Sequence, residues 1–334
     1  MVPPRSSRVS SEAAQWPPAP SRGPVSRCRA RFLLRSEQTG PSPSFPASVS
    51  SAPAGRSIVA VRWVQSQLSW PPVWSISGQA AWPTGGSGIH DAKTDRLLLI
   101  EATPAIESQL SFLHELSGST RPSRVPVDGI LLTHAHIGHY TGLMQLGREV
   151  ASTKKMPVWV TPRMAEFLRH NGPWSQLVQL EQIKLLEVSP GSSFSPLEGL
   201  EIEAITVPHR DEFSDTVAFR IHGPHRTVLF VPDVDRWSGH DGLLESLLEG
   251  VDIAYIDATF YDGRELPGRD LSEIPHPPMV DTMRRLADQA KQHPGSFRFI
   301  HLNHTNPAMR DTALQRSIKD AGFAVAVPGE RVGL

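Results

Sequence analysis

The chain has 334 residues, with 33 Lys and Arg against 34 Asp and Glu and a formal net charge of −1 at pH 7. This balance gives no electrostatic case for a nucleic-acid or anionic-membrane partner. The single cysteine, Cys28, excludes an internal disulfide framework and a cysteine-rich zinc module. No apolar run approaches the roughly 18 residues of a membrane span, so no transmembrane helix is expected.

Residues 1–57 combine eight arginines with only two acidic residues, amid many Ser and Pro. An Arg- and Ser-rich, acid-poor start is typical of an organelle transit peptide, whereas the prolines interrupt any amphipathic helix and favour disorder. A mistranslated 5′ region would have the same composition. We therefore expect a disordered or targeting-like segment over 1–57 and one folded domain over 58–334. A cytoplasmic location is expected, with the mitochondrion as the alternative if 1–57 is a transit peptide.

Apolar patterning then predicts alternating strands and helices along the folded domain. Thr103 and Pro104 suit the N-cap and the first position of a helix. A hairpin is expected over 216–231. Strands are predicted over 58–64, 96–101, 130–132, 158–160, 182–187, 200–207, 216–221, 227–231, 252–256 and 297–302, and helices over 103–116, 139–150 and 163–171.

The most informative stretch is 129–143, GILLTHAHIGHYTGL, where three histidines separate a short apolar run from an amphipathic pattern. Imidazoles at His134, His136 and His139 converge if the chain turns sharply, and Gly138 supplies freedom for that turn. With 14 histidines in the chain, this spacing is expected by chance only about 0.02 to 0.03 times. The stretch therefore predicts a metal site.

The run His134-Ala-His136-Ile-Gly-His139 resembles the HxHxDH signature of the metallo-β-lactamase superfamily. The resemblance implies an αββα sandwich, with two mixed β-sheets and helices on the outer faces. It also implies a metal-dependent hydrolase, in which metal-bound hydroxide attacks an ester or phosphodiester-type substrate. The substrate is expected to be a small or peptide-derived molecule, and a homodimer is compatible with the sequence.

The resemblance also implies two sets of metal ligands, several of which follow predicted strands. Asp233 lies in a Pro-Asp context that is also typical of a turn, and His209 could instead cap a loop. For the last ligand His304 competes with His301, and His304 is preferred because His301 falls within the predicted strand. The first set is His134, His136 and His209, and the second is His139, bridging Asp233 and His304.

One residue departs from the signature, because Gly138 stands where the family usually has aspartate. The second set is left with two histidines and one carboxylate, which is also the facial triad of non-haem iron oxygenases. The three-histidine set is that of a catalytic zinc site. One or two Zn²⁺ ions are expected, with Fe²⁺ and Mn²⁺ as open alternatives.

Two further stretches resemble particular branches of the superfamily. Residues 99–109 resemble a segment of PqqB, the B protein family of pyrroloquinoline quinone biosynthesis. Asp257-Ala-Thr-Phe260 followed by His276 resembles ribonuclease Z-type phosphodiesterases, where that histidine helps the leaving group. His276 and Asp233 are the candidate catalytic residues, His276 as a general acid or phosphate contact; a loop histidine ahead of a helix is the alternative.

Three functions follow from these resemblances. The first is a metallo-hydrolase of the metallo-β-lactamase fold. The second is a PqqB-like, iron-dependent oxygenase that acts on a tyrosine-derived peptide or a quinone precursor. The third is a non-catalytic metal-binding relative in which Gly138 marks a decayed site.

Replacing Gly138 by aspartate is expected to restore the missing ligand and to raise zinc stoichiometry from about one to about two. If Gly138 has a positive φ, the aspartate would cost on the order of 1 kcal/mol in strain. Zinc titration of wild type and variant measures the change. Unchanged stoichiometry in a folded variant would mean that another acid, Asp211 or Asp215, already fills this place.

Overall fold

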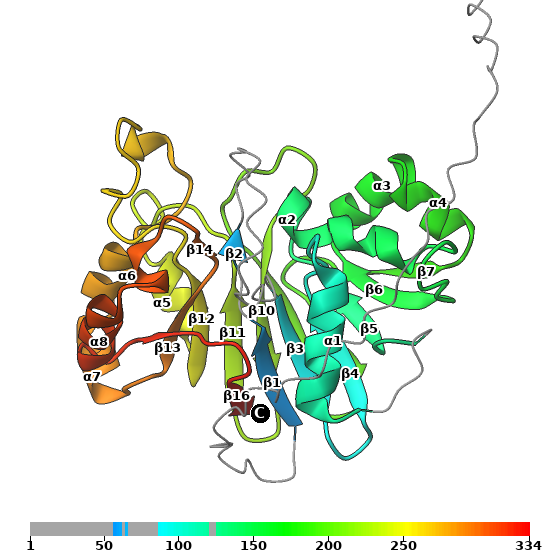
Figure 1. Cartoon of the computed structure of the whole chain (residues 1–334), viewed down its shortest axis with the longest axis horizontal. Coiled ribbons are helices and arrows are strands. Elements are labelled where there is room, and N and C mark those ends of the chain that lie inside the picture. The colour runs from blue at the N-terminus through cyan, green and yellow to red at the C-terminus, as the bar shows by residue number, and fades with distance from the viewer. Residues whose placement is uncertain (1–55, 62–63, 66–85, 120–124) are drawn as a thin grey trace, which may run out of the picture. The chain divides into compact units, whose positions relative to one another are not determined.

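The computed structural model describes residues 56–61, 64–65, 86–119 and 125–334 (Figure 1). The expectation for residues 1–57 falls almost wholly outside the described residues, which begin at Arg56. Among the described residues, no helix is both long enough and apolar enough to span a membrane.

The first sheet has seven strands in the order β16-β1-β3-β4-β5-β6-β7. Antiparallel pairing joins β16, β1, β3 and β4, and parallel pairing joins β4, β5, β6 and β7. The strands are β1 (Arg56–Val61), β3 (Gly86–Asp91), β4 (Arg96–Ile100), β5 (Gly129–Leu131), β6 (Met156–Val160), β7 (Ile183–Glu187) and β16 (Arg331–Gly333).

The second sheet also has seven strands, in the order β15-β13-β12-β11-β10-β9-β8, and repeats the same succession of pairings. It is antiparallel from β8 to β11 and parallel from β11 through β12 and β13 to β15. Its strands are β8 (Ser193–Leu197), β9 (Leu200–Thr206), β10 (Val217–His222), β11 (Thr227–Val231), β12 (Ile253–Asp257), β13 (Phe297–Ile300) and β15 (Ala324–Val325). A separate two-stranded pair joins β2 (Val64–Gln65) to β14 (Leu302–Asn303).

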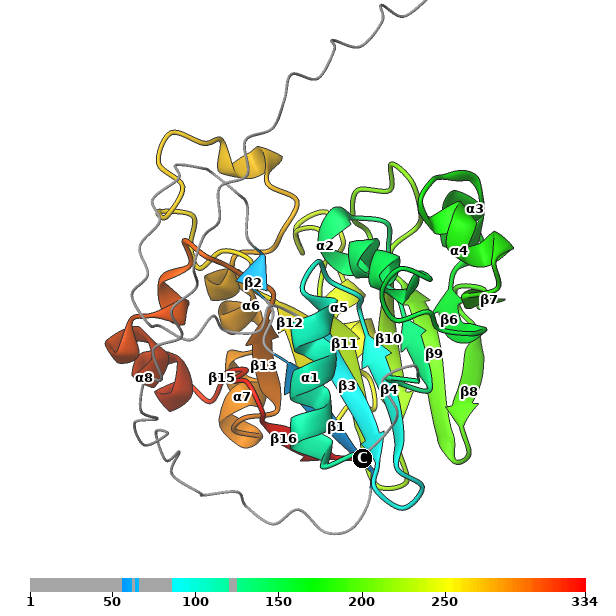
Figure 2. The same ribbon diagram turned by 45° about the vertical axis from the view of Figure 1, so that its right-hand side comes forward.

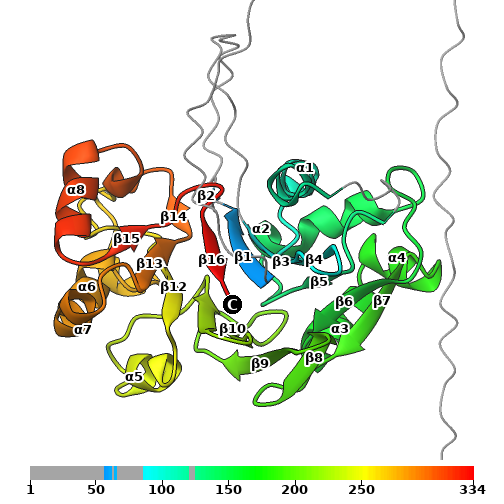
Figure 3. The same cartoon turned by 90° about the horizontal axis from the view of Figure 1, so that it is seen from below.

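The two sheets pack face to face, and helices cover their outer faces (Figures 2 and 3). In β4, Leu98 and Ile100 face the second sheet, whereas Leu97 and Leu99 face the helices. A strand buried on both faces reads as a continuous apolar run, which is why this strand was predictable. The predicted αββα sandwich is therefore confirmed.

Different helices cover the two sheets. The first sheet is covered by α1 (Ile106–Ser117), α2 (Ile137–Tyr140), the 3₁₀ helix η1 (Thr141–Leu146), α3 (Pro162–His170) and α4 (Trp174–Gln179). The second is covered by α5 (Leu243–Leu248), α6 (Met279–Arg285), α7 (Ala287–Gln292), α8 (Thr312–Asp320) and the short 3₁₀ helix η3 (Pro307–Met309). Another 3₁₀ helix, η2 (Leu271–Glu273), lies in the chain between β12 and α6.

Local differences from the prediction cluster near the histidine loop. The helix expected from Thr103 begins at Ile106, because the Thr103 hydroxyl accepts from Ala105 N–H and donates to Gln109 Oε1 instead of capping a helix. The single helix expected over 139–150 is α2 followed by η1. Gly138 lies inside α2 and is not among the positive-φ residues, so the expected glycine turn is not formed.

Gly142 lets η1 approach the segment that leaves β4. Its N–H donates to Ala102 O at 2.9 Å. A Cβ there would lie 2.1 Å from Thr103 O and 2.8 Å from Ile106 Cβ. Backbone atoms cannot give way cheaply, so this contact requires glycine.

We expect Gly142→Ala to lower the free energy of unfolding by about 1–3 kcal/mol because of this overpacking. Denaturant unfolding measures the change. The matched control is Gly333→Ala, where an added Cβ would meet nothing within 4 Å. Equal stability of the two variants would contradict the proposed close packing.

Candidate metal centre

The candidate site residues follow strands of both sheets and meet at one end of the sandwich. Strands β5, β9, β11 and β13 each end shortly before a histidine or an aspartate. In Figure 1, α2, which contains His139, and β14, which directly follows His301, lie at the same end of the sandwich. Open αβ sheets place their sites at the carboxyl ends of strands, and the end of β12 adds Asp257.

The structure brings His134, His136 and His209 together, as the sequence predicted. Their ligand atoms lie within 4.8 Å of one another, and His134 Nε2 is 2.8 Å from His136 Nδ1. Nε2 of His209 is buried and has no hydrogen-bond partner among the described residues. Such an orphaned nitrogen is costly, and a metal ion would accept its lone pair together with the other two. These residues therefore fit a metal ion.

Each of the three imidazoles also uses its second nitrogen. Metal-binding histidines characteristically engage the nitrogen that does not bind the metal, which fixes the orientation of the ring. The contacts are His134 Nδ1 with Thr133 Oγ1 at 2.9 Å, His136 Nε2 with Glu212 Oε2 at 3.1 Å, and His209 Nδ1 with Asp235 Oδ1 at 3.3 Å.

Asp233 lies between the three histidines His134, His136 and His209 and a second group, which it forms with His139 and His301. Its Oδ2 is 2.8 Å from His139 Nε2, 3.3 Å from His301 Nε2 and 3.5 Å from His134 Nε2. Its Oδ1 is 3.7 Å from His209 Nε2. The structure thus places Asp233 where a bridging carboxylate is expected.

The structure corrects the choice of His304. His304 is exposed and belongs to none of the potential metal-binding groups of the described residues, whereas His301 is fully buried beside Asp233. The predicted strand over 297–302 ends at Ile300, and His301 takes a φ of 59°. This left-handed residue breaks the strand alternation on which the choice of His304 depended.

Glu101 is a site residue that the sequence reasoning did not select. It is fully buried, with Oε2 2.6 Å from His139 Nδ1 and with Oε1 accepting the Thr133 N–H at 2.9 Å. Like His301 it directly follows a strand and has a positive φ, of 72°. Glu101 therefore orients His139 towards Asp233. An acidic residue directly after a buried strand was the available indication.

His276 forms a potential metal-binding group with Asp233, Asp257 and His301, and Asp257 supports its ring. Asp257 Oδ2 is 2.7 Å from His276 Nδ1, and His276 Nδ1 is 3.5 Å from Asp233 Oδ1. The Thr259 hydroxyl donates to Asp257 Oδ1 and lies 2.7 Å from His301 Nδ1. Asp257 and Thr259 therefore position two histidines, although the sequence had marked only their resemblance to a motif.

Burial and neighbouring charges set the protonation of the centre. Burial lowers the pKa of His134 well below its usual value and that of His136 to about 4. Both are thus neutral at pH 7, the form that binds metal. Burial opposes ionisation of Asp233, but the imidazoles, with His301 and His139 foremost, hold its pKa well below the usual range.

His139 and His276 are shifted in the other direction. Burial alone would lower the pKa of His139, but Glu101 and Asp233 outweigh it and raise the pKa to about 9. Burial is likewise outweighed at His276, where Asp257 raises the pKa. Metal binding at His139 would therefore release a proton.

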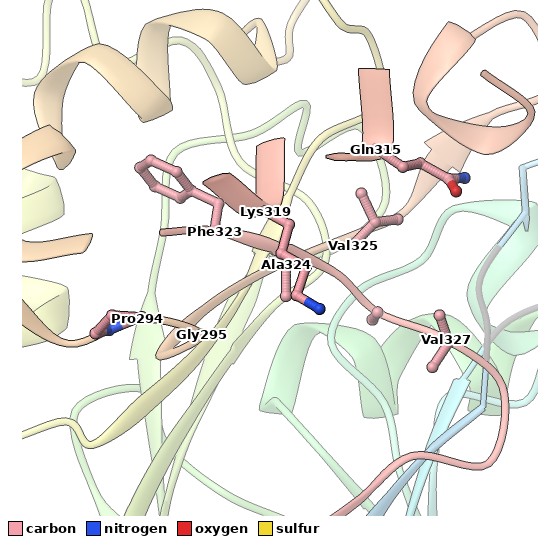
Figure 4. A pocket seen from close by; sticks show the side chains of 9 residues that line it. Pro294, Gly295, Gln315, Lys319, Phe323, Ala324, Val325 and Val327 are labelled. Atoms are coloured by element: carbon pink, nitrogen blue, oxygen red, sulfur yellow. The ribbon is translucent and has the colours of Figure 1, made fainter. Parts of the chain in front are cut away.

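A separate cavity of about 370 Å³ lies beside β15, at the edge of the second sheet (Figure 4). It is lined by Pro294, Gly295, Gln315, Lys319, Phe323, Ala324, Val325, Ala326 and Val327. None of these residues belongs to the His and Asp groups, so the cavity is distinct from the candidate metal centre.

Comparison with known proteins places these observations in a family. Residues 96–326 match the profile of the beta-lactamase superfamily domain. Coenzyme PQQ synthesis protein B of Methylobacterium sp. strain 4-46 is 25% identical over 251 residues, covering 70% of this chain and 81% of that protein. The predicted resemblance to PqqB is thereby confirmed.

Two solved structures show the same fold. Zn²⁺-bound PqqB from Methylobacterium extorquens gives a TM-score of 0.65 at 19% identity, over 83% of this chain and 100% of that one. A diphosphatase from the PhnP family gives 0.56 at 16% identity, over 84% and 97%.

We expect His301→Ala to lower the zinc content or zinc affinity of the protein, because it removes a buried nitrogen beside Asp233. His304→Ala is the matched control and should leave both unchanged. Competition with a chromophoric chelator, followed by metal analysis, gives the two quantities. The assignment of His301 would be wrong if the His304 variant alone lost metal.

Proposed function

The chain belongs to the beta-lactamase superfamily, and from this premise we propose that it is a metal-dependent hydrolase of an ester or phosphodiester bond in a small or peptide-derived substrate. The observation that carries the proposal is the convergence of His134, His136 and His209, where the buried Nε2 of His209 has no hydrogen-bond partner within the described part of the chain. Three imidazoles are the ligand set of a catalytic zinc site.

A zinc ion held by these histidines would lower the pKa of a water molecule to about 7 and polarise the bond to be cleaved. The surrounding side chains supply the rest of the chemistry. Asp233 has carboxylate oxygens near both groups, so it can orient the attacking water. Its low pKa keeps it ionised, and an ionised carboxylate is a hydrogen-bond acceptor only.

His276 is the proposed general acid. Its Nδ1 is engaged by Asp257 at 2.7 Å, which leaves Nε2 to deliver a proton to the leaving group. The Asp257 contact also favours the protonated imidazole, as an acid requires. In this role Asp257 fixes the ring and its charge, much as a carboxylate supports histidine in other hydrolytic sites.

Arg210 adds positive charge beside the centre. It directly follows His209, its half-exposed side chain lies 3.7 Å from Glu212, and its charge contributes to lowering the pKa of His136. A cation there stabilises an anionic substrate and the negative charge that develops during cleavage. This favours a phosphodiester or a carboxylate-bearing ester.

The second candidate is a PqqB-like, iron-dependent oxygenase acting on a tyrosine-derived peptide or quinone precursor. Two observations favour it. The first is the similarity to PqqB. The second is the position of His139 and His301, whose Nε2 atoms both lie close to Asp233 Oδ2. Two histidines and one carboxylate are the ligand type of non-haem iron oxygenases. Gly138 leaves that set without a further carboxylate.

The test begins with metal analysis of protein purified anaerobically, followed by assays of bis(p-nitrophenyl) phosphate and p-nitrophenyl acetate with zinc or iron. Zinc-dependent turnover that falls at least about 100-fold in the His134→Ala, His136→Ala double variant supports the hydrolase. The exposed His240 provides the control His240→Ala, which should keep metal and activity.

A separate variant tests the general acid. His276→Ala should lower kcat by about 10²- to 10⁴-fold with metal content unchanged. The loss should be smaller for p-nitrophenolate, a good leaving group, than for an alkoxide. Iron-dependent oxygen consumption without hydrolysis would favour the second candidate, and metal binding without any turnover would favour a binding role.

A further inference from the structure

The loop between β9 and β10 carries one large apolar side chain that faces water. Phe213 is 59% exposed, although it lies only four residues beyond His209. Isolated exposed apolar residues are common on protein surfaces. The surroundings of Phe213 distinguish it from such residues.

The other residues around Phe213 are fixed to the histidine loop after β5 and to α3. Glu212 contacts His136, and Ser214 Oγ accepts the Ala135 N–H at 2.8 Å. The remaining anchors lie on α3 and its N-cap: Arg163 donates to Asp211 O at 3.1 Å and to its carboxylate at 3.3 Å, and the Thr161 hydroxyl donates to Asp215. The backbone is therefore held on both sides of Phe213, which limits the entropy lost when a ligand binds to it.

The ring of Phe213 packs against an aromatic cluster of Phe167, Tyr140 and Trp174. Its centroid is 5.2 Å from that of Phe167, which is 5.5 Å from Tyr140 and 6.0 Å from Trp174. Tyr140 is buried and directly follows His139. The cluster thus extends from the metal-binding loop to the surface and holds one face of Phe213 still.

A second exposed apolar residue lies across the same contact. Ile137, between His136 and His139, is 71% exposed. Phe213 directly follows Glu212 and Ile137 directly follows His136, so the two apolar residues are sequence neighbours of the residues that form the 3.1 Å His136–Glu212 contact. Two exposed apolar residues therefore adjoin, in the sequence, two polar residues of the candidate centre.

We propose that Phe213 and Ile137 form a subsite for an aromatic group attached to the reacting phosphate or ester. This rests on the proposed function, which places the reacting group beside His136 and Arg210. A flat ring can stack on the free face of Phe213 and cover Ile137, removing apolar surface of both partners from water.

The test compares phenylphosphonate with methylphosphonate, which share the anion and differ only in the apolar group. Calorimetry with the zinc-loaded full chain should show about tenfold tighter binding of phenylphosphonate. In the double variant Phe213→Ser, Ile137→Ser the ratio of the phenylphosphonate affinity to the methylphosphonate affinity should fall towards one. The affinity for methylphosphonate should stay unchanged. That unchanged affinity also shows that the variant is folded.

Val150→Ser is the matched control, because Val150 is 57% exposed and lies outside both the loop and the histidine motif. It should retain the preference for the phenyl group. Equal affinity of the two phosphonates for wild type, or an undiminished preference in the double variant, would overturn the subsite. Phenyl-selective binding without hydrolysis of any ester would support the subsite and reject the hydrolase. Failure of both anions to bind zinc-loaded protein would reject both proposals.

Discussion

The buried carboxylate of Asp233 is the constraint on which the candidate centre depends. A carboxylate that is 2% exposed stays ionised only when cations, hydrogen bonds or a metal compensate its lost hydration. The compensating groups come from both sheets, because His139 follows β5 and His301 follows β13. The end of the sandwich is thus held together by electrostatics as well as by apolar packing.

The histidines around Asp233 are themselves supported by carboxylates. Glu101 engages His139 on the side of the first sheet, and Asp257 engages His276 on the side of the second. The result is an alternating chain of acids and imidazoles, each holding the orientation and charge of the next. Networks of this kind are stabilising when every member is satisfied and costly when one is removed. Both supporting acids lie at strand ends, in sheets that repeat the same succession of antiparallel and parallel pairs.

Much of this could be predicted from local pattern. The spacing of His134, His136 and His139 indicated the metal loop, and apolar runs located most strands, since a strand buried on both faces has a distinct composition. His209 and Asp233 were selected through the resemblance to the metallo-β-lactamase superfamily, and each follows such a run. Position after a strand is visible in sequence, which is why these residues were within reach.

The residues that escaped prediction depend on backbone angles or on contacts distant in sequence. His301 and Glu101 reach the centre through left-handed conformations, which no residue type other than glycine announces. Thr103 looked like a helix cap, yet its hydroxyl is committed to Gln109. The first turn of α2 likewise needs no positive φ at Gly138. A short helix, and not a glycine turn, brings His139 to the candidate centre.

The positive φ angles of Glu101 and His301 have a consequence for how this protein can change over generations. A non-glycine residue in that conformation costs on the order of 1 kcal/mol or more, so glycine at either position would relieve local strain while deleting a side chain of the centre. That relief is small beside the cost of leaving His139 or Asp233 buried without its partner. Neither position can therefore be relaxed to glycine without loosening the candidate centre.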